Sequence, residues 1–162
     1  EFHNFMKVNG DLNLNNSSIE SLGNLKKVKG DLYLMESSIE SLGELEEVQG
    51  SLNLYNCQNL KDLGKLKRID SQLILSDCKN LKTLGKVGWC EDLNLYNCSS
   101  LISLENLEEV EATLDLTNCK SLKTLGKLKK CSLIFLYGSG ITKKYINKEK
   151  SFLLKFCDWK KN

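Results

Sequence analysis

The chain of 162 residues contains no proline and one histidine, and aromatic residues make up only 7% of it. The absence of proline suits an unbroken ladder of stacked strands. A lone His3 leaves no nucleophile–histidine arrangement, and the chain has neither a Cys-x-x-Cys pair nor a phosphate-binding glycine loop. We therefore expect no catalytic residue, no bound metal, no small-molecule substrate and no cofactor.

Long apolar runs are also missing. No stretch approaches the roughly 18 residues that a membrane-spanning helix needs, and no charged-then-apolar N-terminal signal is present. We expect no membrane contact. The wealth of lysine and asparagine favours a microbial or viral source.

Leucine is abundant, and it recurs with a fixed period. Seven L-x-L or I-x-L pairs begin 20 or 21 residues apart. Self-similarity at this period is typical of a solenoid, in which each turn buries its apolar edge against its neighbours. The pairs begin at Leu12, Leu32, Leu52, Leu73, Leu93, Leu114 and Ile134.

Residues 30–49 represent one turn. The alternation in residues 31–35 predicts a short strand with one buried face. Apolar residues then recur three apart, which favours tight turns or extended segments over a full helix: Ile39, Leu42, Leu45 and Val48. Gly43 and its counterparts lie in the middle of this return, where conformational freedom is useful.

This pattern resembles the leucine-rich repeat family, whose turn carries L-x-x-L-x-L-x-x-N/C-x-L. The resemblance covers about seven turns and is closest to the short bacterial, internalin-like class. It implies an α/β solenoid: a right-handed coil with a parallel β-sheet on one face. We divide the chain into a partial repeat or cap (1–9), the solenoid (10–141) and a C-terminal helical cap with a basic tail (142–162).

The seven cysteines follow the repeat. Four occupy the N/C position of the family, where a small inward side chain can bond to buried loop backbone: Cys57, Cys78, Cys98 and Cys119. Cys90 and Cys131 replace core residues such as Val28. Because serine fills the N/C position in other turns, we expect free thiols and hence a reducing, cytoplasmic compartment.

The repeat stops at Ile141, and residues 143–160 then show a helical pattern. Phe152, Phe156 and Trp159 share one face at helical spacing, which favours a cap over the open end of the solenoid and leaves a partner-binding helix as the alternative. Residues 119–162 carry 2 acidic and 12 basic side chains, against 9 and 4 in residues 1–50.

A candidate binding surface follows from the strands, because residues between the buried leucines face outward. This band carries few charges and several aromatic or flexible apolar groups, as the centres of protein interfaces do. Aromatic stacking that only stabilises the sheet is the alternative. The candidate partner-binding residues are Tyr33, Met35, Tyr55, Ile74, Tyr96, Phe135 and Tyr137.

Trp89 is a further candidate, because its counterparts in the other turns are charged. A tryptophan at an exposed position indicates a binding contact, although Gly88 beside it could let the indole fold back over the turn. We accordingly expect a monomeric, non-catalytic module that binds a protein partner.

Two other functions stay open. The first is binding of nucleic acid or an acidic partner through the C-terminal lysines: Lys120, Lys123, Lys127, Lys129, Lys130, Lys143 and Lys144. The second is recognition on behalf of a larger effector or enzyme.

Overall fold

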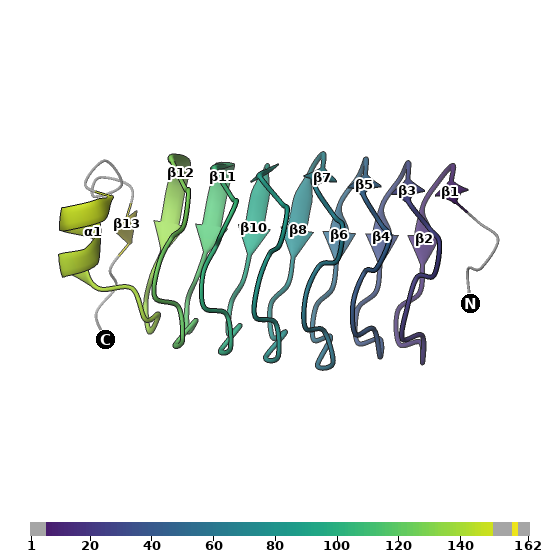
Figure 1. Cartoon of the computed structure of the whole chain (residues 1–162), viewed down its shortest axis with the longest axis horizontal. Coiled ribbons are helices and arrows are strands. Elements are labelled where there is room, and N and C mark those ends of the chain that lie inside the picture. The colour runs from purple at the N-terminus through teal and green to yellow at the C-terminus, as the bar shows by residue number, and fades with distance from the viewer. Residues whose placement is uncertain (1–5, 151–156, 159–162) are drawn as a thin grey trace.

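Short parallel strands stack into a solenoid of about six turns, followed by a short helix toward the C-terminal end (Figure 1). The computed structural model describes residues 6–150 and 157–158. Each turn places a strand beside the equivalent strand of the next turn, so segments about 20 residues apart become neighbours.

The larger sheet contains the predicted strands in the predicted register. Leu12 pairs with Leu32, Leu32 with Leu52, and the column continues in this way to Ile134. The seven strands of this column enclose six complete turns, where we predicted about seven. They are β2 (Leu12–Asn13), β4 (Leu32–Tyr33), β6 (Leu52–Asn53), β8 (Gln72–Ile74), β10 (Asp92–Asn94), β11 (Glu109–Asp115) and β12 (Lys130–Phe135).

A second, smaller parallel sheet lies on the return of the N-terminal turns, where the spacing of apolar residues favours turns or extended segments. Its strands are β1 (Lys7–Val8), β3 (Lys27–Val28), β5 (Glu47–Val48) and β7 (Arg68–Ile69). Farther along, β9 (Trp89–Cys90) pairs with the first residues of β11. The long strands β11 and β12 therefore run through positions that belong to both sheets in earlier turns.

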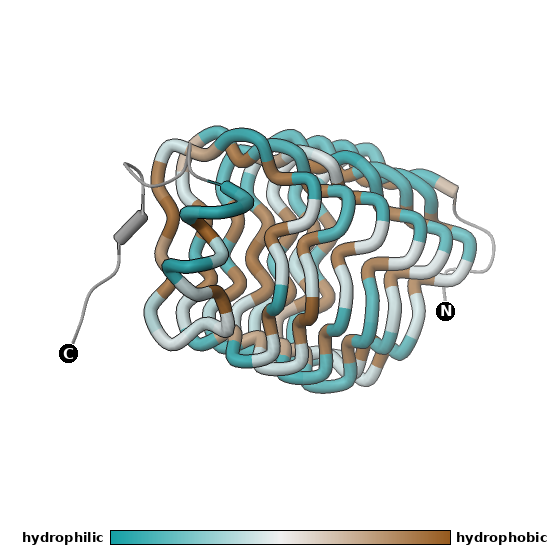
Figure 2. The backbone as a smooth tube through the Cα atoms, turned by 60° about the vertical axis from the view of Figure 1, so that its left-hand side comes forward, coloured by the Kyte–Doolittle hydropathy of each residue, from teal (hydrophilic) through white to brown (hydrophobic). Residues whose placement is uncertain are grey.

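The core is a continuous column of leucine, isoleucine, valine and cysteine. The return residues Ile39, Leu42 and Leu45 are fully buried, as their spacing predicted. Figure 2 shows the hydrophobic residues recurring at corresponding places in successive turns. Each buried aliphatic side chain contributes about 1.5–3 kcal/mol relative to an exposed one. Leu12 and Leu14 in the first turn are only half-buried, although they pack against this core.

Thiols of the N/C position satisfy buried backbone groups, as the sequence predicted. Cys57 Sγ donates to the carbonyl of Leu34 at 3.0 Å, and Cys78 Sγ donates to that of Leu54 at 3.0 Å. Cys98 and Cys119 repeat the contact one turn later each. The six cysteines within residues 6–150 are all buried and free.

The return contains a residue with left-handed backbone, which explains the recurring glycine. Gly43, Gly64 and Gly85 have φ values of 57°, 57° and 60°. They stack on each other, and their surroundings differ. A Cβ on Gly64 would lie 2.5 Å from the carbonyl oxygen of Gly43, whereas a Cβ on Gly85 would lie 3.6 Å from that of Gly64.

These two glycines give a matched pair of variants. Gly85→Ala should lower the free energy of unfolding by about 1–2 kcal/mol, the cost of left-handed backbone with a side chain. Gly64→Ala should cost clearly more, because the backbone of the neighbouring turn must also shift. Urea unfolding of both variants measures the difference, and equal losses would contradict the stacking distance.

The C-terminal segment differs from the prediction of one helix over residues 143–160. The helix α1 spans Lys143–Glu149, and β13 (Cys157–Asp158) adds a strand to the larger sheet beside β12. The prediction is therefore wrong at Cys157, because pairing with an open sheet edge competes with helical periodicity. Phe152, Phe156 and Trp159 lie outside the described residues.

Helix α1 packs on the end of the solenoid. Thr142 caps it by accepting a hydrogen bond from the Tyr145 N–H at 3.1 Å. The Tyr145 hydroxyl accepts a bond from the Leu125 N–H at 2.9 Å, and Ile146 is fully buried. The helix thus covers part of the final turn.

Candidate partner-binding surface

The outward side of the larger sheet carries two columns of side chains. In the second turn, Leu32 and Leu34 are buried, while Tyr33 and Met35 on the opposite side are half-buried. In-register pairing aligns these positions from turn to turn. We call the two columns the sheet face: Asn13, Tyr33, Asn53, Ile74, Asn94, Asp115 and Phe135, with Asn15, Met35, Tyr55, Ser76, Tyr96, Thr117 and Tyr137.

Seven of the eight predicted partner-binding residues lie on the sheet face. Tyr55, Tyr96 and Tyr137 are the most exposed of them, at 37%, 41% and 40%. The remaining four are half-buried: Tyr33, Met35, Ile74 and Phe135. The structure thus gathers these seven on one surface, while their contact with a partner stays a prediction.

The tyrosine column is uneven. Ser76 separates Tyr55 from Tyr96 and is buried, although its place in the column faces outward. Two steps between neighbouring strands place the two tyrosine backbones about 10 Å apart. Two large exposed rings therefore flank a small covered residue.

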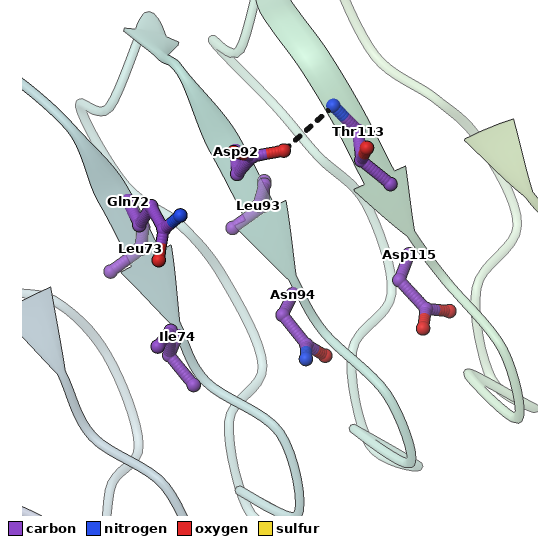
Figure 3. Close-up of a pocket in the computed structure, with 8 residues that line it drawn as sticks. All are labelled: Gln72, Leu73, Ile74, Asp92, Leu93, Asn94, Thr113 and Asp115. Atoms are coloured by element: carbon purple, nitrogen blue, oxygen red, sulfur yellow. Dashed lines mark hydrogen bonds between the residues drawn. The ribbon is translucent and has the colours of Figure 1, made fainter. Parts of the chain in front are cut away.

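A hollow of about 310 Å³ lies on the sheet face, over β8, β10 and β11. Figure 3 shows the side chains of Ile74, Asn94 and Asp115 lying next to each other across the three strands. The upper part of the hollow is polar, where Asp92 accepts a hydrogen bond from the Thr113 N–H at 2.9 Å. The sheet face thus combines exposed aromatic groups with a recess that has both polar and apolar lining residues.

Asparagines of the first column hold the backbone that carries the tyrosines. Asn53 Oδ1 accepts a hydrogen bond from the Tyr55 N–H at 3.0 Å, and Asn94 Oδ1 accepts one from the Tyr96 N–H at 3.0 Å. Asparagine side chains commonly form such hydrogen bonds to the backbone two residues farther along the chain. We missed this role, although the recurring Asn-x-Tyr spacing could have indicated it.

Tyr33 is held by its hydroxyl group. This hydroxyl donates to Asp31 Oδ2 at 2.7 Å, while the Ser51 N–H donates to Asp31 Oδ1 at 2.7 Å. The hydrogen bond from the Ser51 backbone is the larger cause of a lowered pKa at Asp31, and the bond from the Tyr33 hydroxyl is the second cause. The hydroxyl hydrogen of Tyr33 is therefore already engaged within the chain.

Trp89 lies outside the sheet face. It sits on β9, in register with Glu109, at the position that the smaller sheet occupies in earlier turns. Its side chain is 36% exposed, so the indole is partly exposed to solvent. The structure does not bring Trp89 into the tyrosine columns, and we therefore leave it out of the proposed binding surface, although its sequence position indicated a contact.

Four of the seven C-terminal lysines of the alternative hypothesis fall into two groups. Lys129 pairs with Glu108 at 2.7 Å, and Lys130 pairs with Glu109, each one turn back. The same pairing between turns occurs at Lys61–Glu40, Lys65–Glu44 and Lys67–Glu46. These lysines are thus matched by carboxylates of the chain, whereas Lys120 and Lys123 line a separate hollow on the turn side.

Residues 6–150 and 157–158 contain neither a cluster of metal ligands nor a membrane-spanning helix. No three His, Cys, Asp or Glu side chains in this part gather closely enough to hold a metal ion. No helix in it is long and apolar enough to cross a membrane. His3 lies outside the described residues.

Most of the buried thiols are poor nucleophiles at neutral pH, whereas hydrogen bonding with Cys78 lowers the pKa of the Cys57 thiol. Burial raises the pKa of Cys90 to about 12 and that of Cys119 to about 12. The pKa of Cys98 is also raised, mainly by burial. Reactive cysteines have the opposite setting, with a lowered pKa and partial exposure.

Thiol-specific reagents should therefore distinguish the folded from the unfolded protein. Six cysteines should react at least about 100-fold more slowly in the folded state, because the reagent reaches them only after opening of the core. Ellman's reagent with and without denaturant measures the rates. Rapid labelling of more than one thiol in the folded protein would contradict the burial of the thiol column.

In comparisons with known proteins, the chain matched no family model, no curated protein and no solved structure.

Proposed function

We propose that this chain is a monomeric, non-catalytic module of the leucine-rich repeat type that binds a protein partner through the sheet face. The observation that carries the proposal is the exposure of Tyr55, Tyr96 and Tyr137 on one rigid surface. Tyrosine supplies a large contact area at a small cost in conformational entropy and is enriched among the residues that dominate binding energy.

The backbone beneath these rings supports the proposal. Hydrogen bonds join each turn to the next in both sheets, and the Asn53 and Asn94 side chains fix the residues that carry the tyrosines. A surface that is rigid before binding loses less entropy when the partner docks. The recess beside Asp115 would provide polar contacts that select one partner over another.

The leucine-rich repeat assignment rests on the inward L-x-L pairs and on thiols that bond to the carbonyl of a leucine one turn back. A reducing compartment for these thiols stays a prediction. Recognition on behalf of a larger effector or enzyme is compatible with the same surface.

Affinity capture from the native source tests the proposal. The bait proteins are the wild type, the double variant Tyr55→Ala/Tyr96→Ala, and Trp89→Ala as a control aromatic of similar exposure. The proposal expects a protein retained by the wild type and the control but lost from the double variant. Equal retention by the double variant would show that the sheet face is not the binding site.

A further inference from the structure

A second hollow, of about 470 Å³, lies on the turn side of the solenoid, away from the sheet face. Lys82, Ile102 and Lys123 follow each other here on three successive turns: the Ile102 N–H donates to the Lys82 carbonyl, and the Lys123 N–H donates to the Ile102 carbonyl. Their backbones are therefore about 4.8 Å apart per step. Lys120 lines the same hollow.

These lysines differ from the ion-paired lysines of the solenoid in the residues that lie near them on the preceding turn. Lys61 forms an ion pair with Glu40 of the preceding turn, at 2.8 Å, and Lys129 forms one with Glu108. The residue one turn before Lys123 is Ile102, which has no charge. Among the described residues, Lys82, Lys120 and Lys123 form no ion pair, so three positive charges converge without a carboxylate of the chain.

Ile102 gives the hollow an apolar centre. Its side chain is 47% exposed, which is more than that of any other leucine, isoleucine or valine within residues 6–150. Serine side chains of the same hollow, Ser100 and Ser121, supply neutral hydrogen-bonding groups around it. Ile102 is thus an apolar contact site between the ammonium groups of Lys82 and Lys123, neither of which forms an ion pair among the described residues.

We propose that this hollow binds an acidic peptide segment of a protein partner. An aliphatic or aromatic side chain of the segment rests on Ile102, and carboxylates on either side of that residue pair with Lys82 and Lys123. The apolar centre favours a peptide over nucleic acid, whose phosphates would use the lysines but leave Ile102 without a matching group. This site is separate from the sheet face and does not depend on its function.

Fluorescence anisotropy with three labelled probes tests the proposal. The first is a peptide with Glu-Glu-Leu-Glu-Glu in a glycine–serine frame, the second replaces every glutamate with glutamine, and the third is a single-stranded RNA of similar length. The folded wild type should bind the first peptide more tightly than the other two probes.

Variants of the chain locate the site. Lys82→Gln/Lys123→Gln should weaken binding of the acidic peptide about tenfold, since each partly exposed ion pair contributes up to about 1 kcal/mol. Ile102→Ser should weaken it about threefold or more by removing apolar contact. The control Lys26→Gln/Lys86→Gln makes the same change in net charge outside the hollow and should leave the affinity within about twofold of the wild type.

Three outcomes would overturn the proposal. The first is equal weakening by the two lysine pairs, which would indicate only diffuse charge attraction. The second is RNA binding as tight as peptide binding together with no effect of Ile102→Ser, which would indicate a nucleic-acid site. The third is absence of binding to the acidic peptide at low salt.

Discussion

Alanine at both Tyr55 and Tyr96 lowers the affinity for the captured partner at least about 100-fold, because large aromatic rings at the centre of an interface carry most of its energy. The two side chains are among the most exposed aromatic groups on the sheet face, so their loss opens no cavity in the core. The free energy of unfolding therefore falls by at most about 2 kcal/mol, the combined range of strand propensity at two sites. Calorimetric titration and urea unfolding of the same samples measure the two quantities.

Trp89→Ala is the matched control for this double variant. Its exposed fraction, 36%, equals that of Tyr55 within one percentage point, but the residue lies on β9 outside the tyrosine columns. We expect the control to keep the wild-type affinity. If the double variant loses stability in proportion to binding, the tyrosines serve the sheet and the binding hypothesis fails.

Leu75→Ala should lower the free energy of unfolding by about 3 kcal/mol, within the range for buried leucine truncations. Leu75 directly follows β8 in the chain and is fully buried. Turns above and below it restrict collapse of the cavity, because their own strands are held by the ladder of backbone bonds.

Leu14→Ala provides the comparison, since Leu14 holds the same place in the first turn and is only half-buried. We expect it to cost clearly less than Leu75→Ala when both are measured by urea unfolding. Similar losses at the two positions would contradict a core formed by stacking of turns, in which an end position has fewer neighbours.

The leucine period was sufficient to predict the larger sheet and its register. Each L-x-L pair has a buried and an outward side, and a fixed repeat length leaves one alignment that stacks all pairs. The cysteine positions were predictable for the same reason, because serine replaces cysteine at Ser37 and Ser139 without changing the period.

The smaller sheet could not be predicted in the same way. Its strands are two residues long, as in Lys27–Val28, and so short a stretch carries no period to separate a strand from a turn. The length of α1 was overestimated because Phe152 and Phe156 continue a helical pattern that the sequence cannot weigh against strand pairing at Cys157.

The sequence was sufficient to predict which residues belong to the candidate surface, but not how exposed each of them is. Alternation identified the outward residues, including Tyr55 and Tyr96. It could not indicate that Ser76 between them is covered, or that Asp115 borders a recess. Both properties depend on side chains from neighbouring turns. The sequence also left open whether Trp89 is a binding contact or folds back over its turn, because that depends on neighbouring turns as well.

Photo-crosslinking from single positions is the most direct test of the sheet face as the docking surface. A benzophenone amino acid replaces Tyr55, Tyr96 or Trp89 in turn, and each protein is irradiated with the captured partner. The account predicts covalent adducts from positions 55 and 96 and none from position 89. Adducts from position 89 alone, or no adduct from either tyrosine position while the partner is bound, would contradict it.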